Sequence, residues 1–158
     1  MSGDNVDAGL VVTTPTDTRI VMTRRFAAPR RLVFAALTEP DLLRRWLGAD
    51  GWHLIEADVD LRVGGRWRFV SRGPGGALLG HGGEYRVVDP PARLVYTERY
   101  DDRWVAGEAL VEAALTEVDE GRATVLTTTL TYPSRELRDH VLRSPMARGV
   151  GEGHRRLD

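Results

Sequence analysis

The sequence contains no cysteine and no lysine, since all 22 basic residues are arginine. Without cysteine, the chain has no disulfide, no thiol nucleophile and no thiolate zinc site. Without lysine, it has no side chain for a Schiff base and no phosphate-binding lysine of a P-loop. Glutamine is missing too, and Asn5 is the only asparagine. These absences exclude several enzyme classes, while the all-arginine usage indicates a GC-rich genome more than a function.

Charge of one sign and long apolar runs are also lacking. The formal net charge of the 158 residues is −1, which gives no global field to attract nucleic acid or an anionic membrane. No apolar run approaches the ~18 residues that span a bilayer. The N-terminus is polar and acidic, unlike a secretion signal. We therefore expect a cytoplasmic protein with no nucleic-acid or membrane partner, built as a disordered or loosely ordered leader (residues 1–17) and one domain (residues 18–158).

The hydrophobic period changes along the domain and predicts an α+β fold. Two short helices follow the first strand, around residues 29–38 and 40–47, where Pro29 and Pro40 suit a first helical turn. Six more strands and a C-terminal helix follow, and Ser134 is expected to cap the helical region. A break is expected at Ser144-Pro145. The strands are predicted at residues 18–26, 53–60, 66–71, 78–88, 93–100, 107–118 and 122–132.

Glycine pairs mark the expected irregularities of this sheet. Gly64-Gly65 predicts a tight hairpin with positive φ angles. Gly82-Gly83 predicts a bulge inside a strand. None of these pairs has the strand-to-helix setting of a phosphate-binding loop. The prediction is a curved antiparallel sheet of six to seven strands wrapped around a C-terminal helix.

Several short motifs follow one another from residue 18 to the end of the chain. They are Ala28-Pro29…Phe34…Ala36-Leu37-Thr38…Pro40…Leu43…Trp46, Asp60-x-Arg62-x-Gly64-Gly65-x-Trp67, Gly83-x-Tyr85, Pro90-Pro91-x-Arg93-Leu94-x-Tyr96-Thr97, Tyr132-Pro133-Ser134-x-Glu136-x-Arg138-Asp139 and Gly149-x-x-Glu152-Gly153. In this order they resemble the START-like (SRPBCC) superfamily. Within it, the chain is most similar to the single-domain bacterial form of the family named after the activator of the heat-shock protein 90 ATPase.

This resemblance implies a helix-grip fold with a pocket for a hydrophobic or aromatic small molecule between the sheet and the C-terminal helix. The aromatic residues support such a pocket independently, because ligand sites are mostly apolar with a few placed polar groups. The alternative is that the same rings only fill a core. The expected cavity residues are Trp46, Trp67, Phe69, Tyr85, Tyr96, Glu98, Tyr100, Trp104, Met146 and Val150.

Two of the polar residues are weak catalytic candidates. Glu98 shares a strand face with Tyr96 and Tyr100, and a carboxyl group among aromatic rings has a raised pKa and serves as a general acid or base. We favour the plainer alternative, in which Glu98 pairs with an arginine of a neighbouring strand or points outward. His81 is the one histidine expected near the pocket, while His140 and His154 are expected at the surface. No histidine spacing indicates a metal site, and no cofactor is expected.

Three functions remain open. The first is binding of an apolar or aromatic small molecule. The second is a co-chaperone-like role on a heat-shock protein 90 ATPase, with a contact patch around Arg44, Arg45 and Trp52. The third is a cyclase- or hydratase-type enzyme that uses Glu98 or His81, although the chain is more readily explained as a non-enzyme. Either a monomer or a homodimer is compatible with the resemblance.

Overall fold

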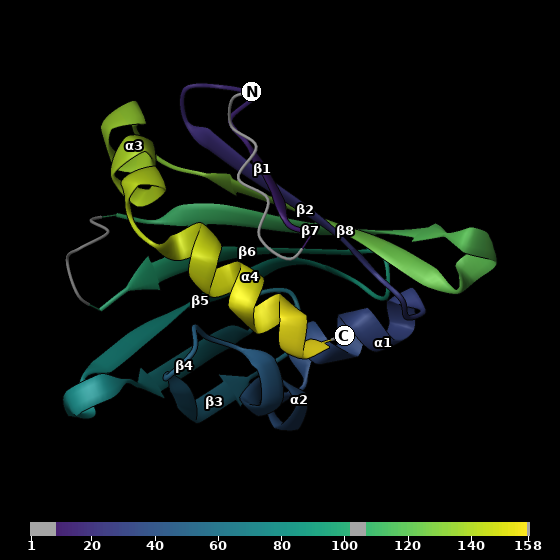
Figure 1. The fold of residues 1–158 in the computed structure, drawn as a ribbon, viewed down its shortest axis with the longest axis horizontal. Helices are drawn as coiled ribbons and strands as arrows, with labels where there is room; N and C mark the ends of the chain where they lie inside the picture. The colour runs from purple at the N-terminus through teal and green to yellow at the C-terminus, as the bar shows by residue number, and fades with distance from the viewer. Residues whose placement is uncertain (1–8, 102–106, 158) are drawn as a thin grey trace.

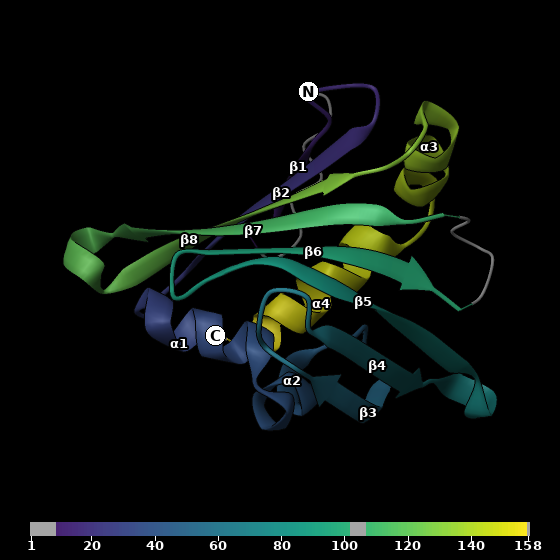
Figure 2. The same ribbon diagram turned by 180° about the vertical axis from the view of Figure 1, so that it is seen from behind.

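The computed structural model describes residues 9–101 and 107–157, apart from the side chain of Ala147. Within them, eight strands form one antiparallel sheet in the order β1-β2-β8-β7-β6-β5-β4-β3 (Figure 2). Residues 1–8 of the expected leader, Trp104 of the expected cavity and the final Asp158 lie outside the described residues. The strands are β1 (Val11–Thr13), β2 (Arg19–Phe26), β3 (His53–Val59), β4 (Arg66–Arg72), β5 (Leu78–Asp89), β6 (Arg93–Tyr100), β7 (Ala109–Val118) and β8 (Ala123–Thr131).

The helices gather on one face of this curved sheet, as the helix-grip fold requires. The C-terminal helix α4 lies across the middle strands in Figure 1, with α1 and α2 at one of its ends and α3 at the other. Seen from behind in Figure 2, β5 to β8 have no helix in front of them. The four helices are α1 (Arg30–Thr38), α2 (Pro40–Trp46), α3 (Arg135–Arg143) and α4 (Met146–Leu157).

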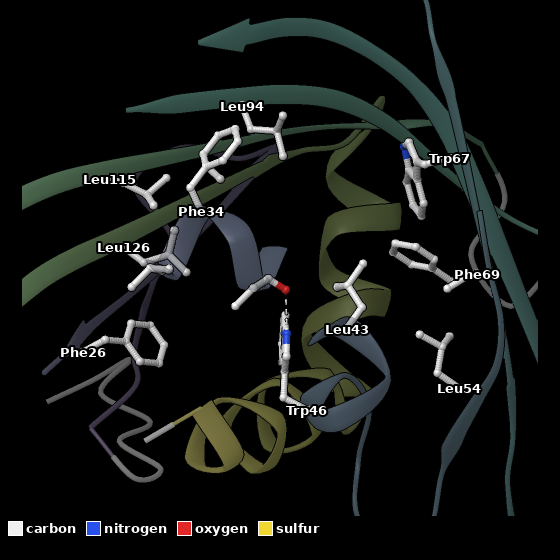
Figure 3. Close-up of a cluster of buried hydrophobic side chains, with 14 of the residues drawn as sticks. Phe26, Phe34, Leu43, Trp46, Leu54, Trp67, Phe69, Leu94, Leu115 and Leu126 are labelled. Carbon is white, nitrogen blue, oxygen red and sulfur yellow. Dashed lines mark hydrogen bonds between the residues drawn. The ribbon is translucent and has the colours of Figure 1, made fainter. Parts of the chain in front are cut away.

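Pro40 and Trp46 fix the path between the first two helices. Glu39 is extended and ends α1, as expected for a residue that precedes proline, and Pro40 begins α2. Pro40 has no N–H, so it cannot donate to the carbonyl group of Ala36 four residues earlier. The indole Nε1–H of Trp46 donates to that oxygen instead, at 2.7 Å (dashed line in Figure 3). The Trp46 ring therefore both fills the core and completes the end of α1.

A serine cap begins α3, and a glycine allows α4 to pack closely against α2. Ser134 Oγ accepts the backbone N–H of Leu137 at 3.1 Å and caps α3. The predicted break at Ser144-Pro145 is confirmed, because α3 ends at Arg143 and α4 begins at Met146. Gly153 lets α4 approach α2, since a Cβ atom there would lie 3.0 Å from the carbonyl oxygen of Trp46.

The sheet departs from the prediction in three details. Its eighth strand, β1, pairs with β2 and buries Val12, in a segment expected to belong to the loosely ordered leader. The register of β5 against β6 shifts between Tyr85 and Val87 and not at the glycine pair, so the predicted position of the bulge is wrong. Gly64 has the expected positive φ of 83° but Gly65 does not have one, and the connection of β3 to β4 spans residues 60–65 and is longer than a tight hairpin.

The core consists of two clusters joined by Tyr96. One packs α1, α2 and the Trp67 face of β4 against the middle of the sheet (Figure 3). The other packs β1, β2 and the start of β7 against α3 and the first half of α4. Tyr96 contacts both clusters. Residues of β6 that share its face therefore point into the space between sheet and helices.

Candidate ligand-binding site

Five aromatic side chains on β4, β5 and β6 form one group with His81 on the helix side of the sheet. The His81 ring stacks on Tyr100, with centroids 4.8 Å apart and an interplanar angle of 18°. Trp67 meets both His81 and Tyr96 edge-to-face, each at 5.3 Å between centroids. These contacts follow from the register, which places His81 opposite Tyr100. The other members are Phe69, 5.0 Å from Trp67, and Tyr85, 6.2 Å from Tyr96.

Glu98 is the carboxyl group within this aromatic group. Its Oε2 atom lies 4.0 Å from His81 Nε2, and the side chains of Glu98 and His81 are 15% and 13% exposed. Glu98 therefore points inward with the neighbouring tyrosines. The plainer expectation, that Glu98 pairs with an arginine or points outward, is wrong. The reason is that the arginines of β4 to β6 alternate onto the opposite face, where Arg68 binds Asp101.

Burial shifts the pKa values of this pair in opposite senses. Loss of water raises the pKa of Glu98 to about 7, because it disfavours the carboxylate. Burial, reinforced by the charge of Arg68, lowers the pKa of His81 to about 4. At neutral pH His81 is thus uncharged, while Glu98 is distributed between its acid and carboxylate forms. Such a carboxyl group can hold or release a proton within the site.

Two polar atoms of the group have no hydrogen-bond partner among the described residues. They are the indole Nε1 of Trp67 and the Nδ1 of His81, and both are shielded from water. Figure 3 shows that the Trp67 nitrogen lies at the end of the ring remote from Phe69. Because buried polar groups are nearly always paired, each unpaired one calls for an explanation.

The structure brings together most of the predicted cavity residues. Trp67, Phe69, Tyr85, Tyr96, Glu98 and Tyr100 surround His81 or adjoin its neighbours. Met146 and Val150 reach the same region from α4, where they pack in one cluster with Tyr96 and Tyr100. Trp46 belongs to the core on the α2 side, and its ring contact is with His154 at 5.8 Å.

The expectation of surface positions holds for His140 but is wrong for His154. His154 is 6% exposed and meets the ring of Phe26 edge-to-face at 5.2 Å. Its burial lowers its pKa to about 4, and the charge of Arg24 adds to this effect. Met146, Val150, His154 and Leu157 follow one another at helical spacing, so the period of α4 was the signal that places His154 inward.

Glu152 is a second buried residue of α4 that sequence analysis gave no role. Glu152 Oε1 accepts the backbone N–H of Asp50 at 3.0 Å, and its Oε2 accepts from Arg148 at 3.2 Å. Arg156 donates to the carbonyl oxygen of Trp46 at 3.2 Å and to Asp50 at 2.7 Å. These bonds hold the C-terminal half of α4 against the loop that follows α2.

A groove of about 810 Å³ lies on the other face of the sheet, away from α4. Its charged lining residues largely pair with one another, with Arg68 bound to Asp101 and Arg86 near Glu84. It is a different feature from the pocket that the sequence predicts between sheet and helix. Among the described residues, no cluster of histidine or carboxylate side chains could hold a metal ion. None of the helices in this part of the chain has the length and hydrophobicity to cross a membrane.

Comparison with known proteins relates this architecture to one family. Residues 27–158 match the model of the family described as Activator of Hsp90 ATPase homolog 1-like protein. A crystal structure of a Rhodobacter sphaeroides protein is 38% identical over 94% of this chain and 95% of its own, with a TM-score of 0.87. A Mycobacterium smegmatis protein is 25% identical over 94% of each chain, with a TM-score of 0.82.

More distant structures share the fold. An Hsp90 activator from Plasmodium falciparum is 23% identical over 72% of each chain, with a TM-score of 0.53. No curated protein matches the sequence.

Proposed function

The chain belongs to the Activator of Hsp90 ATPase homolog 1-like family, and from this premise we propose that it binds an apolar or aromatic small molecule between its sheet and α4. The fold is the helix-grip fold of the START-like superfamily, in which the sheet and the C-terminal helix face each other. The proposed ligand contacts Trp67, Tyr96, Tyr100 and, from the helix, Val150.

One observation carries this proposal. His81 and Glu98 are surrounded by protein, so that burial is the main cause of both pKa shifts, yet their side chains keep 13% and 15% of their surface accessible. We take this remaining accessible surface as the border of the space in which the ligand would bind. Aromatic walls with a few polar groups are the usual lining of a small-molecule site.

The composition of α4 supports the same proposal. Its sequence from Met146 to Leu157 contains three glycines, and its apolar residues are Met146, Ala147, Val150 and Leu157. The side chain that α4 brings to Tyr96 and Tyr100 in its middle is therefore a small one, Val150. At this one position α4 therefore leaves more room beside Tyr96 and Tyr100 than a larger side chain would.

Native mass spectrometry tests the proposal directly. The protein is measured as purified and after incubation with a small-molecule extract of cells, beside a denatured sample that gives the bare chain mass. We expect a reproducible extra mass that is lost on denaturation. Bare chain in every native spectrum would contradict the proposal.

A matched pair of variants locates the bound molecule. Val150→Trp fills the space beside Tyr96 and Tyr100, and we expect it to abolish the extra mass. Leu142→Trp adds the same ring at an exposed position of α3, and we expect it to leave the extra mass unchanged. An extra mass that survives in Val150→Trp would place the ligand elsewhere.

The family description favours one alternative, a role on an Hsp90 chaperone. The exposed Arg44 and Arg45 in the last turn of α2 form the patch that would test it. If the chain binds such a chaperone through this patch, the double variant Arg44→Glu, Arg45→Glu loses binding and keeps the ligand mass. A chaperone titration without detectable binding of the native chain would dismiss this alternative.

A further inference from the structure

The polar atoms of the aromatic group limit which chemical groups a ligand can present to it. Trp67 Nε1 is a donor and never an acceptor, so it can be satisfied only by an acceptor atom. The nitrogen is shielded from water in this structure, and solvent therefore cannot supply that acceptor. His81 and Tyr96 are polar neighbours whose ring centroids each lie 5.3 Å from that of Trp67, and neither accepts a hydrogen bond from Trp67 Nε1.

The second unpaired atom, His81 Nδ1, also needs a hydrogen-bonding partner. His81 is neutral at pH 7, so one ring nitrogen donates and the other accepts. Its Nε2 atom faces Glu98 at 4.0 Å, and Nδ1 remains for a ligand. Trp67 and His81 together thus offer two adjacent hydrogen-bonding positions within an aromatic wall.

The charges around the site argue against an ionised ligand. An anion would meet Glu98, and Arg68, the cation whose charge acts on His81, already binds both carboxylate oxygens of Asp101 on the outer face. A cation would be attracted to Glu98 and to the aromatic faces. An ammonium group has no lone pair for Trp67, however, and in its place would leave that buried donor unpaired.

We propose that this site selects an uncharged aromatic or apolar ligand that carries a hydrogen-bond acceptor, such as a ketone or hydroxyl oxygen, and that this oxygen binds Trp67 Nε1 beside His81. The inference rests on the proposed function, because it names the ligand class of the same site. Since Trp67 Nε1 is shielded, the rings must separate when the ligand enters. The accessible surface at His81 and Glu98 marks where they do so.

Isothermal titration with two probes of nearly equal shape tests this inference. 2-Acetylnaphthalene carries the acceptor oxygen, whereas 2-isopropylnaphthalene replaces it with a methyl group. We expect the ketone to bind at least about fivefold more tightly, since it satisfies a buried donor that the hydrocarbon leaves unpaired. Equal binding, or tighter binding of the hydrocarbon, would overturn the inference and leave the proposed function intact. Failure of both probes to bind would overturn both.

The variant Trp67→Phe identifies the donor. It keeps an aromatic ring and removes the N–H, so the preference for the ketone should vanish while the hydrocarbon binds within about twofold of its native affinity. Trp46→Phe is the matched control, because the N–H of Trp46 already bonds Ala36. The Trp46→Phe variant should therefore keep the native preference for the ketone over the hydrocarbon. A preference that persists in Trp67→Phe would contradict the assignment.

Charged probes of the same size complete the test. 2-Naphthoate and 2-naphthylmethylammonium are expected to bind more weakly than the ketone. Tightest binding of the ammonium probe would show that Glu98 and the rings form a cation site, and would overturn the inference. Because the wild-type comparison stands alone, the proposal can be contradicted even if a variant does not fold.

Discussion

The two ends of the interior differ in how their buried polar groups are paired. At the α2–α4 end, the Trp46 indole bonds Ala36, and Glu152 accepts the N–H of Asp50. At the end formed by β4, β5 and β6, Trp67 Nε1 and His81 Nδ1 have no partner among the described residues. His154 Nδ1 is an unpaired exception at the first end.

This difference distinguishes a structural part of the interior from the candidate ligand-binding site. A buried polar group without a partner costs about 1–3 kcal/mol of stability. The indole of Trp46 avoids this cost through the carbonyl oxygen of Ala36, whereas the indole of Trp67 does not. Positions where a protein breaks a local rule are often functional. We therefore interpret the α2–α4 contacts as structural and the Trp67–His81–Glu98 group as the place of ligand recognition.

The largest expected effect distinguishes the two buried tryptophans. Trp46→Phe leaves the carbonyl oxygen of Ala36 without its indole donor and loses core volume, so it should lower the free energy of unfolding by about 3 kcal/mol. Trp67→Phe loses similar volume but removes an unpaired donor, so its cost should be clearly smaller. Urea unfolding of both variants measures this. Equal losses would remove the distinction between the two ends.

The next effect is the contribution of Glu98 to the pH dependence of folding stability. Its pKa is about 7 in the folded chain, above the ordinary 4.5, so the unfolded chain binds fewer protons between these values. Glu98 therefore makes the fold less stable as pH rises from 4.5 to 7, whereas the lowered pKa values of His81 and His154 act oppositely between about 4 and 6.5.

Glu98→Gln isolates the first of these contributions. The difference in unfolding free energy between the variant and the native chain should grow in favour of the variant from pH 4.5 to 7, by at most about 3 kcal/mol, and then level off. Unfolding curves at pH 4.5, 5.5, 6.5 and 7.5 record it. A difference independent of pH would show that Glu98 titrates normally.

A smaller loss in the free energy of unfolding is expected for a change at Glu152, whose carboxylate is paired. Glu152→Gln keeps an acceptor for the N–H of Asp50 but weakens the charge-assisted bond from Arg148, so we expect a loss of about 1 kcal/mol. The probe affinities should not change, because Glu152 holds α4 in place and does not face the aromatic group. A changed ketone preference would show that the two ends are coupled.

The smallest effect is expected outside both regions. Arg45→Glu changes an exposed side chain of α2 with no bonding partner in the described part of the chain. Stability should change by less than about 0.5 kcal/mol. Thermal unfolding measures this. A larger loss of stability would mean that the exposed surface of α2 contributes to folding stability.

Sequence reasoning predicted the fold well because its signals are local. Alternation predicted β2, prolines predicted the α1–α2 junction, and the Ser134 cap predicted the start of α3. Alternation also placed Tyr96, Glu98 and Tyr100 on one strand face, and the structure brings Glu98 and Tyr100 together at His81. By contrast, the contact of Glu98 with His81 depends on the β5–β6 register, which no local pattern reveals.

Other features of the site depend on long-range packing. Whether an indole N–H is paired depends on atoms distant in sequence, as with Trp46 and Ala36 or with Trp67. The burial of His154 was within reach, because the spacing of Met146, Val150 and His154 predicts one inward face of α4. The surface assignment of His154 ignored that period.

A nitrogen–proton correlation spectrum of the indole groups tests the central claim most directly. The indole signals of Trp46 and Trp67 are assigned by their loss in the two phenylalanine variants, and 2-acetylnaphthalene is then added to the native protein. Our account predicts a downfield shift of the Trp67 indole proton as it gains an acceptor, with the Trp46 signal unmoved. A Trp67 signal that stays in place while the probe binds would contradict it.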